Sequence, residues 1–193
     1  MAQHGPMARL PAVLGTDDLP LAELCAARID GELMRIGAGW CPVDEPDLPG
    51  LRAAAVAPRL PPPLIVERRS AAWVHGALPA PPAVAECCVP PEARVAARND
   101  PTCTIREVAI AEAEIVEIGG VRCTSLDRTV FDLVRDPAGD DRSTVDVVRA
   151  LIAIDPGAAE RVGDRLGSTT RLPHKSLAVG RLAAARAQPS LTR

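Results

Sequence analysis

The chain has 193 residues, of which 47% are hydrophobic and 24% charged, and its formal net charge is −3. This is the composition of a soluble globular protein, with one large domain or two small ones. Only 2% of the residues are aromatic and Tyr is absent. The core must therefore consist of Ala, Val, Leu and Ile, and recognition of nucleic acid by stacking bases on aromatic side chains is nearly excluded.

No segment predicts a membrane, secreted or metal-binding protein. The first fifteen residues, MAQHGPMARLPAVLG, lack the basic start and long apolar run of a signal peptide. No stretch of about 18 apolar residues occurs. The six Cys contain no CxxC pair and the three His have no ligand spacing, so we expect no metal and no cofactor. We expect a cytoplasmic protein with reduced thiols.

The first predicted elements are a helix and a hairpin. Pro20 suits the first turn of a helix and Gly31 its end, which predicts a helix over residues 19–30. Its apolar face consists of Leu21, Leu24, Cys25 and Ile29. The stretches ELMRI and WCPV, joined by GAG, predict two short strands with a glycine turn. A helix followed by a hairpin is the second half of a winged-helix module, in which Arg28 and Arg35 would meet a DNA duplex.

The rest of the chain predicts an α+β body with a small mixed sheet and carboxyl-terminal helices. Residues 48–57 predict a helix that ends at the proline-rich stretch PRLPPP. LIVE predicts a short buried strand, and residues 70–75 a helix closed by Gly76. Four stretches then predict a sheet with one solvated face: VAECCVP, TCTIREVAI, EIVEI and VRCTS. Further helices are predicted over residues 125–135, 143–154, 157–166 and 174–187.

The segment GVRCTSLDRTVFDLVR holds the only Phe of the chain and an Arg–Asp pair four residues apart, and it predicts a structural helix. Thr124 stands three residues before Asp127, which is the spacing of a capping box. Arg128 and Asp132 fall opposite the apolar face, as an exposed pair four residues apart. Phe131 lies at the edge of that face, where it can seal the helix against the sheet. The apolar face itself consists of Leu126, Val130, Leu133 and Val134.

No motif predicts catalysis. No Cys, Asp or Glu lies at helical spacing from His75, so a packed or capping His is favoured over a ligand or base. GSTTR and GAG lack the spacing of a phosphate-binding loop. Asp140 and Asp141 fall in a polar loop, where carboxylates at a helix start are expected. We expect no enzymatic activity.

The last part of the chain is basic. From residue 161 onward, seven cationic side chains stand against Asp164 alone, a charge of +6. Such a tail indicates either an anionic partner or a solvated helix face that keeps the protein soluble. For the partner reading, the binding residues would be Arg171, Lys175, Arg181 and Arg186. That reading predicts that changing Arg171, Lys175 and Arg181 to Glu leaves the melting temperature nearly unchanged.

Two segments resemble the AbiEi family, the antitoxins of type IV toxin–antitoxin systems of actinobacteria. RRSAAWVHGAL contains the family's Ser-Ala-Ala-x-x-His-Gly pattern at residues 70–76. GGVRCTSLDRTVFDLVR contains its Gly-Val-x-x-Thr-Ser-x-x-Arg-Thr-x-x-Asp-Leu pattern at residues 120–133. LPHKSLAVGRLAAA resembles its basic last helix. The resemblance covers about residues 19–185.

The resemblance implies a winged-helix-like module over residues 1–45 and an antitoxin domain over residues 46–193. It implies a protein that represses its own promoter and counters a nucleotidyltransferase toxin, with Arg28 and Arg35 on DNA. The family module has two helices before its recognition helix, and only about eighteen residues precede this one, so the module is shortened. The alternative is an orphan protein-interaction module that keeps the fold and binds no DNA.

Overall fold

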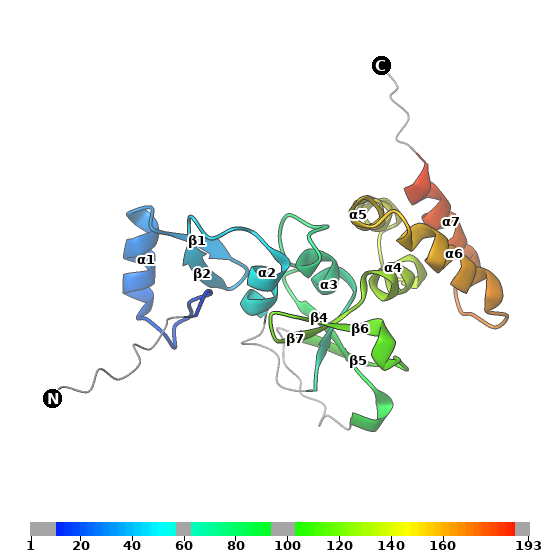
Figure 1. The fold of residues 1–193 in the computed structure, drawn as a ribbon, viewed down its shortest axis with the longest axis horizontal. Coiled ribbons are helices and arrows are strands. Elements are labelled where there is room, and N and C mark those ends of the chain that lie inside the picture. Colours follow the sequence, from blue (N-terminus) through cyan, green and yellow to red (C-terminus); the bar gives the residue numbers. More distant parts are fainter. Residues whose placement is uncertain (1–10, 57–62, 94–102, 188–193) are drawn as a thin grey trace, which may run out of the picture.

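The structure, a computed structural model, describes residues 11–56, 63–93 and 103–187. Its elements follow one another along the long axis of the molecule (Figure 1). The first helix and a hairpin lie at one end, a five-stranded sheet lies in the middle, and the last helices lie at the other end. The α+β class predicted from the sequence is confirmed. The described residues contain no helix long and apolar enough to span a membrane.

Helix α1 spans Leu21–Ile29, directly after Pro20. Gly31 follows it with φ of 79°, a left-handed conformation that glycine adopts without steric cost and that ends the helix. The predicted helix of residues 19–30 is therefore confirmed to within two residues. It does not continue into the hairpin.

The hairpin consists of β1 (Leu33–Ile36) and β2 (Gly39–Pro42). The strands pair antiparallel with Ile36 opposite Gly39, so Gly37 and Ala38 form a two-residue turn. The predicted glycine turn is thus confirmed. The segment before α1 also joins this sheet, because Leu14 forms an isolated bridge with Trp40.

Gly39 stands where that incoming segment crosses the hairpin. A Cβ at this position would lie 2.5 Å from Val13 Cγ1 and 2.9 Å from the backbone oxygen of Leu14. We expect Gly39→Ala to lower the free energy of unfolding by roughly 1–3 kcal/mol, because backbone and core must shift to admit the methyl group. The matched control is Gly180→Ala on a helix, where nothing lies within 4 Å. There chemical denaturation should show stabilisation of roughly 0.5–1 kcal/mol. Equal midpoints for the two variants would contradict this packing.

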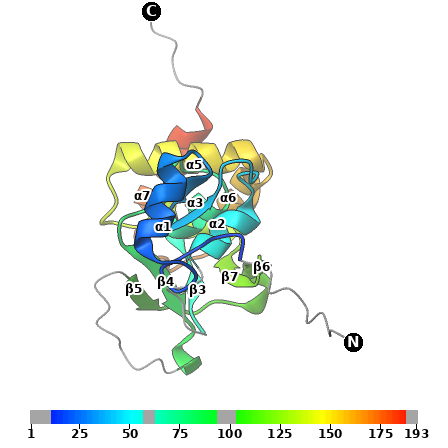
Figure 2. The same ribbon diagram turned by 90° about the vertical axis from the view of Figure 1, so that its left-hand side faces the viewer.

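The central sheet is mixed. Its strands are ordered β5-β4-β3-β7-β6, and Figure 2 shows them in this order below the helices. β4–β5 and β3–β7 are parallel pairs, whereas β3–β4 and β6–β7 are antiparallel. All five strands lie within the stretches predicted as strands. They are β3 (Ile65–Val66), β4 (Ala85–Val89), β5 (Cys103–Glu107), β6 (Ile115–Ile118) and β7 (Val121–Thr124).

Six further α-helices occur in the described part of the chain. Helices α2 and α3 accompany the sheet, and α4 contacts α3 and each of the last three helices. The predicted proline-rich end of α2 falls on residues 57–62, outside the described residues. The helices are α2 (Pro49–Val56), α3 (Arg68–Val74), α4 (Leu126–Arg135), α5 (Asp141–Ile154), α6 (Ala158–Ser168) and α7 (Lys175–Arg186).

The start of α4 differs from the predicted capping box. The residue that caps the helix is Ser125, whose Oγ accepts a hydrogen bond of 3.3 Å from Arg128 N. Thr124 ends β7 instead, and its fully buried hydroxyl lies 2.7 Å from the hydroxyl of Thr129. The Thr124 prediction was wrong because a hydroxyl inside a sheet finds its partner in the core and not at the helix end.

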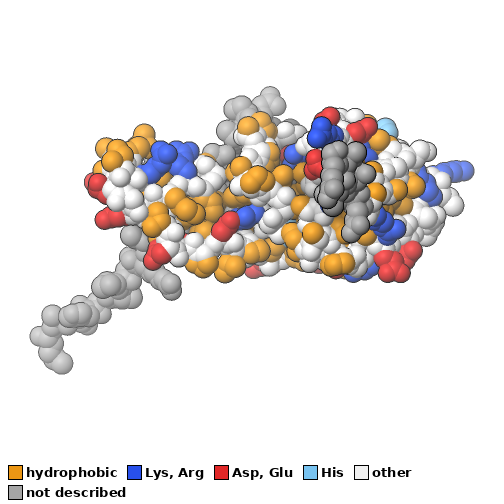
Figure 3. Space-filling view, turned by 90° about the horizontal axis from the view of Figure 1, so that it is seen from above, with side chains coloured by type: hydrophobic (Ala, Val, Ile, Leu, Met, Phe, Trp, Pro, Cys, Tyr) orange, Lys and Arg blue, Asp and Glu red, His pale blue; other side chains and the backbone are white. Residues whose placement is uncertain are grey.

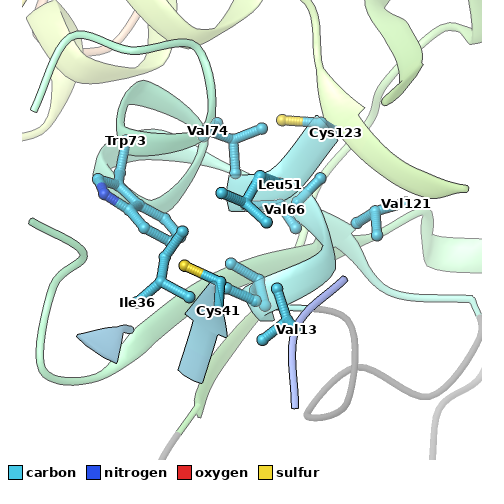
Figure 4. Packing of buried hydrophobic residues seen from close by; sticks show 13 residues of the cluster. Val13, Ile36, Cys41, Leu51, Val66, Trp73, Val74, Val121 and Cys123 are labelled. Atoms are coloured by element: carbon cyan, nitrogen blue, oxygen red, sulfur yellow. The ribbon is translucent and has the colours of Figure 1, made fainter. Parts of the chain in front are cut away.

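The hairpin and the sheet share one hydrophobic core. Figure 4 shows Val13, Ile36 and Cys41 packed against Leu51 of α2 and Trp73 of α3. A second core lies among α4, α5, α6 and α7, into which Ala72 of α3 also reaches. Helix α1 contributes to neither of these two clusters. The body therefore has two packed clusters, to both of which α3 contributes, and α1 lies outside both.

Candidate interaction surfaces

Helix α1 is held at its end of the molecule by a single buried side chain. Leu24 is fully buried and packs with Leu14 and Trp40. Three other apolar residues, Leu21, Cys25 and Ile29, are exposed, Leu21 to 54% and Ile29 to 84%. They follow one another at intervals of four residues, so they share one face of the helix. We call this face the α1 stripe. Figure 3 shows hydrophobic side chains open to solvent at this end of the molecule.

The surroundings of the α1 stripe are acidic. Residues 11–48 contain eight carboxylates and two guanidiniums, a formal charge of −6. Within the described residues only Asp47 of the eight is ion-paired, to Arg52 of α2. An apolar face amid unpaired carboxylates suits a protein partner that is apolar and basic. The same carboxylates repel the phosphates of a DNA duplex.

The two predicted DNA-binding residues lie on neighbouring elements of this end. Arg28 is in the last turn of α1 and is exposed, without a partner among the described residues. Arg35 is on β1 and is also exposed, and its guanidinium carbon lies 4.7 Å from the centre of the Trp40 ring. Both side chains are open to solvent, and they are the only cations among the eight carboxylates of residues 11–48.

Arg181, predicted as an exposed partner-binding residue, is buried, with 4% of its surface exposed. Its guanidinium donates to the backbone oxygens of Asp136 and Gly139 at 2.6 Å each, and to Asp141 at 2.5 Å. It therefore holds the loop between α4 and α5 to α7. The prediction failed because the partners of Arg181 are about forty residues away in the sequence, and helical spacing reveals nothing about them.

The other three predicted partner-binding residues remain at the surface. Lys175 donates to the backbone oxygens of Gly167 and Thr169, at 3.2 and 2.8 Å, and so satisfies the end of α6. Arg186 is exposed and donates to the backbone oxygen of Ala159. Arg171 is exposed and has no partner among the described residues. The positive tail is thus partly structural, and the charges at these three positions have no carboxylate partner within the described ranges.

Arg128 and Asp132 do not face water, contrary to the sequence prediction. They are 5% and 6% exposed, and Arg128 Nε donates to Asp132 Oδ2 at 2.8 Å. Arg128 also donates to Glu114 at 2.8 Å and to the backbone oxygen of Ala109 at 3.1 Å. Glu114 comes from the segment before β6, and Ala109 from the segment after β5. Helical periodicity could not show that a second layer covers this face of α4.

Two more ion pairs extend the pair into a network. Arg106 of β5 donates twice to Glu67, at 2.7 and 2.6 Å, and Glu67 is 1% exposed. Arg165 of α6 reaches Glu114 at 2.5 Å. Glu114 is partly buried, and burial raises its pKa, but hydrogen bonds and the two arginines prevail, so that the pKa of Glu114 is lowered overall. The network joins the sheet, α4 and α6, and its members neutralise one another.

His75 has the packed role that the sequence favoured. Its Nε2 lies 2.8 Å from the backbone oxygen of Thr124, so Nε2 carries the proton and donates. Burial lowers the pKa of His75, which keeps the ring neutral. Cys123 Sγ lies 4.0 Å from the same nitrogen, and burial raises the pKa of this thiol to about 12. A protonated nitrogen beside an un-ionised thiol does not make a nucleophile and its base.

A cavity of about 660 Å³ lies between the hairpin turn, α2, α3 and residues 79–85. Two polar side chains in its lining, Arg52 and Ser70, are already bonded. Arg52 donates twice to Asp47, at 2.6 Å, and to the backbone oxygens of Trp73 and Leu78. Ser70 Oγ accepts from Glu86 N at 2.9 Å. In the described part of the chain, no group of three His, Cys, Asp or Glu could hold a metal ion.

Two features of the surface were missed by sequence reasoning. Phe131 was expected to seal α4 against the sheet, but it lies among the helices, between Arg135 at 4.7 Å and Arg165 at 3.8 Å from the ring centre. Arg135 follows Phe131 by four residues, a spacing that places two side chains together on a helix. That spacing was the signal available for Arg135. The exposure of the α1 stripe had no signal, because its pattern is that of a core-facing helix.

No protein-family model and no curated protein matches the chain. Among solved structures the chain is similar to the Rv2827c protein of Mycobacterium tuberculosis, with a TM-score of 0.47 and 16% sequence identity. The similarity covers 91% of this chain and 73% of that chain. It is a likeness of fold and assigns no function.

Proposed function

We propose that the protein is a non-enzymatic, antitoxin-like module that counters a nucleotidyltransferase toxin by direct contact with a protein surface. The AbiEi resemblance supports the antitoxin class. Its two segments, far apart in the sequence, pack together as α3 and α4, and His75 links them by its hydrogen bond to Thr124. The residues of these two segments pack against each other and therefore identify the fold. Contact with a partner has to be made by residues at the surface.

The main support for contact with a protein is the exposed α1 stripe, which lies in an acidic part of the chain. Leu21 and Ile29 are apolar, exposed and on one face, and no described element covers them. A helix of nine residues with one buried side chain is weakly stabilised by itself. A partner that covers the α1 stripe would stabilise the helix and remove its apolar surface from water. Because residues 11–48 carry a charge of −6, the occupant is a protein face with apolar residues flanked by Lys or Arg.

A second candidate function is repression of the protein's own promoter. The observations in its favour are the helix–hairpin order and the exposure of Arg28 and Arg35. The charge of −6 over residues 11–48 opposes it. The alternative of an orphan interaction module uses the same α1 stripe with another basic protein. It would be favoured if no nucleotidyltransferase gene lies beside the gene for this protein.

Ile29→Lys is the test of the protein-contact reading. The side chain is 84% exposed at the end of α1, where a cation suits the helix dipole, so folding should be unchanged. If the partner is basic, the new positive charge should repel its Lys and Arg side chains. We expect affinity for the neighbouring nucleotidyltransferase to fall at least about tenfold, measured by calorimetry, together with loss of growth protection on co-expression.

The control is Val179→Lys on α7, an apolar residue that is 49% exposed at the other end of the molecule. It should bind and protect as the wild type does. If Ile29→Lys protects fully while Arg28→Ala and Arg35→Ala abolish protection, promoter binding replaces protein contact as the function.

A further inference from the structure

Arg135, the last residue of α4, is the arginine that the charge network leaves without a counter-ion. Arg106, Arg128 and Arg165 each reach a carboxylate, whereas no described carboxylate lies within 4.0 Å of the guanidinium of Arg135. Its one hydrogen bond is a long one, from Nε to the backbone oxygen of Pro173 at 3.5 Å. The side chain is half-buried. A cation in this position has lost part of its water and gained no charge partner.

The position of Arg135 is fixed by its neighbours. Its guanidinium carbon lies 4.7 Å from the centre of the Phe131 ring, and Arg165 lies 3.8 Å from the centre of the same ring. Phe131 is 4% exposed, so the ring is a rigid support. A guanidinium held against an aromatic ring is oriented before a ligand arrives, which reduces the entropy lost on binding.

Other cationic side chains lie near Arg135, although three of them are paired with carboxylates. Burial lowers the pKa of Arg135, and three nearby arginines lower it further although the buried Asp132 acts the other way. The loop that carries Pro173 also carries Arg171, exposed and unpartnered in the described chain, and Lys175, bonded to backbone oxygens alone. The three arginines near Arg135 are Arg128, Arg165 and Arg106.

We propose that Arg135, together with the exposed Arg171 on the loop that contacts it, forms a binding site for the carboxylates of an acidic protein segment. A carboxylate supplies the counter-charge that Arg135 lacks, and the planar guanidinium can donate to both of its oxygens. The site lies at the opposite end of the molecule from the α1 stripe. It is a second contact beyond the proposed function, and each can exist without the other.

Carboxylates fit this corner better than nucleic acid does. The aromatic ring at the site is covered by the two guanidiniums, so no base can stack on it. The chain as a whole carries −3, and its other end carries −6 over residues 11–48, which opposes a long polyanion. A short acidic segment contacts only the arginines of this corner and does not extend to the acidic end of the molecule.

The test is binding of a fluorescent hexaglutamate peptide at low salt, measured by anisotropy, to the full chain. Arg135→Gln should lower the affinity for the peptide about tenfold, as expected for loss of a charge-assisted hydrogen-bonded pair. Arg171→Glu, at an exposed position without a described partner, should weaken it as much without affecting folding. Arg28→Gln is the matched control, because Arg28 is exposed and unpartnered at the far end of the molecule, and it should bind as the wild type does.

The site would be overturned by unchanged affinity in Arg135→Gln and Arg171→Glu, by an equal loss in Arg28→Gln, or by tighter binding of a short DNA duplex than of the peptide at the same ionic strength. The last would assign the corner to nucleic acid. Growth protection by wild-type protein that does not bind the peptide would overturn this site and leave the proposed function standing.

Discussion

Arg181→Met is expected to lower the free energy of unfolding by about 3–5 kcal/mol. The guanidinium is 4% exposed and donates to the backbone oxygens of Asp136 and Gly139, and Met fills the space without supplying a donor. Both oxygens are partly buried, and an oxygen removed from water that loses its donor is not compensated for that removal. Against a total stability of about 5–15 kcal/mol, such a loss is easily seen in a urea denaturation curve.

Arg171→Glu is the comparison for Arg181→Met. Arg171 is exposed and has no described partner, so this change should stay within about 0.5 kcal/mol of the wild type. Reversing Arg171, Lys175 and Arg181 together should therefore unfold the protein through Arg181, contrary to the sequence-based expectation of an unchanged melting temperature. Coincident unfolding curves for Arg181→Met and wild type would show that the hydrogen bonds of Arg181 contribute nothing.

Arg128→Met is expected to lower the free energy of unfolding by a similar amount, about 3–5 kcal/mol. It removes the donor to Asp132, which is 6% exposed, and to the backbone oxygen of Ala109. Asp132 would then face Arg106 at 4.0 Å as its nearest ion-pair partner. A buried carboxylate without a close counter-ion is the main source of the loss, and thermal unfolding followed by circular dichroism measures it.

The double variant Arg128→Met with Asp132→Leu separates the cost of an orphaned charge from the worth of the ion pair. Replacing both partners by apolar side chains removes the unpaired carboxylate of Asp132, while Glu114 keeps Arg165 and Glu67 keeps Arg106. The double variant should therefore be more stable than Arg128→Met alone. A double variant that loses the sum of the two single losses would show that the two residues act independently.

Much of the fold could be predicted from the sequence, because its signals are local. Pro20 and Gly31 mark the ends of α1 within two residues, and the glycines of GAG give the turn of the hairpin. The strands of the sheet are short β-branched runs between turn residues. These signals act over a few residues and depend little on what packs against them.

The buried charges could not be predicted, because their partners are distant in the sequence. Arg128 looks exposed on a helical wheel, and only the fold brings Glu114 and Ala109 over it. Arg181 looks like part of a basic surface until the loop after α4 closes around it. Arg135 remains half-buried without a carboxylate for the same reason, since the surrounding loops decide which arginines find partners.

For the α1 stripe the sequence prediction was wrong in the other direction, because apolar residues expected in the core are exposed. Leu21, Leu24, Cys25 and Ile29 form an amphipathic pattern that predicts a face turned to the core, but only Leu24 is buried. Periodicity tells which residues share a face and not whether the chain itself covers that face. An apolar face that the described chain does not cover is the property on which the proposed protein contact rests.

Binding of the full chain to its own promoter decides whether the α1 end of the molecule contacts protein or DNA. With a duplex of that promoter at low salt we expect no specific complex, because residues 11–48, which include the α1 stripe, carry −6. A specific complex whose affinity falls steeply with salt, and which Arg28→Ala and Arg35→Ala each weaken, would contradict it and make this end of the molecule a DNA-binding module.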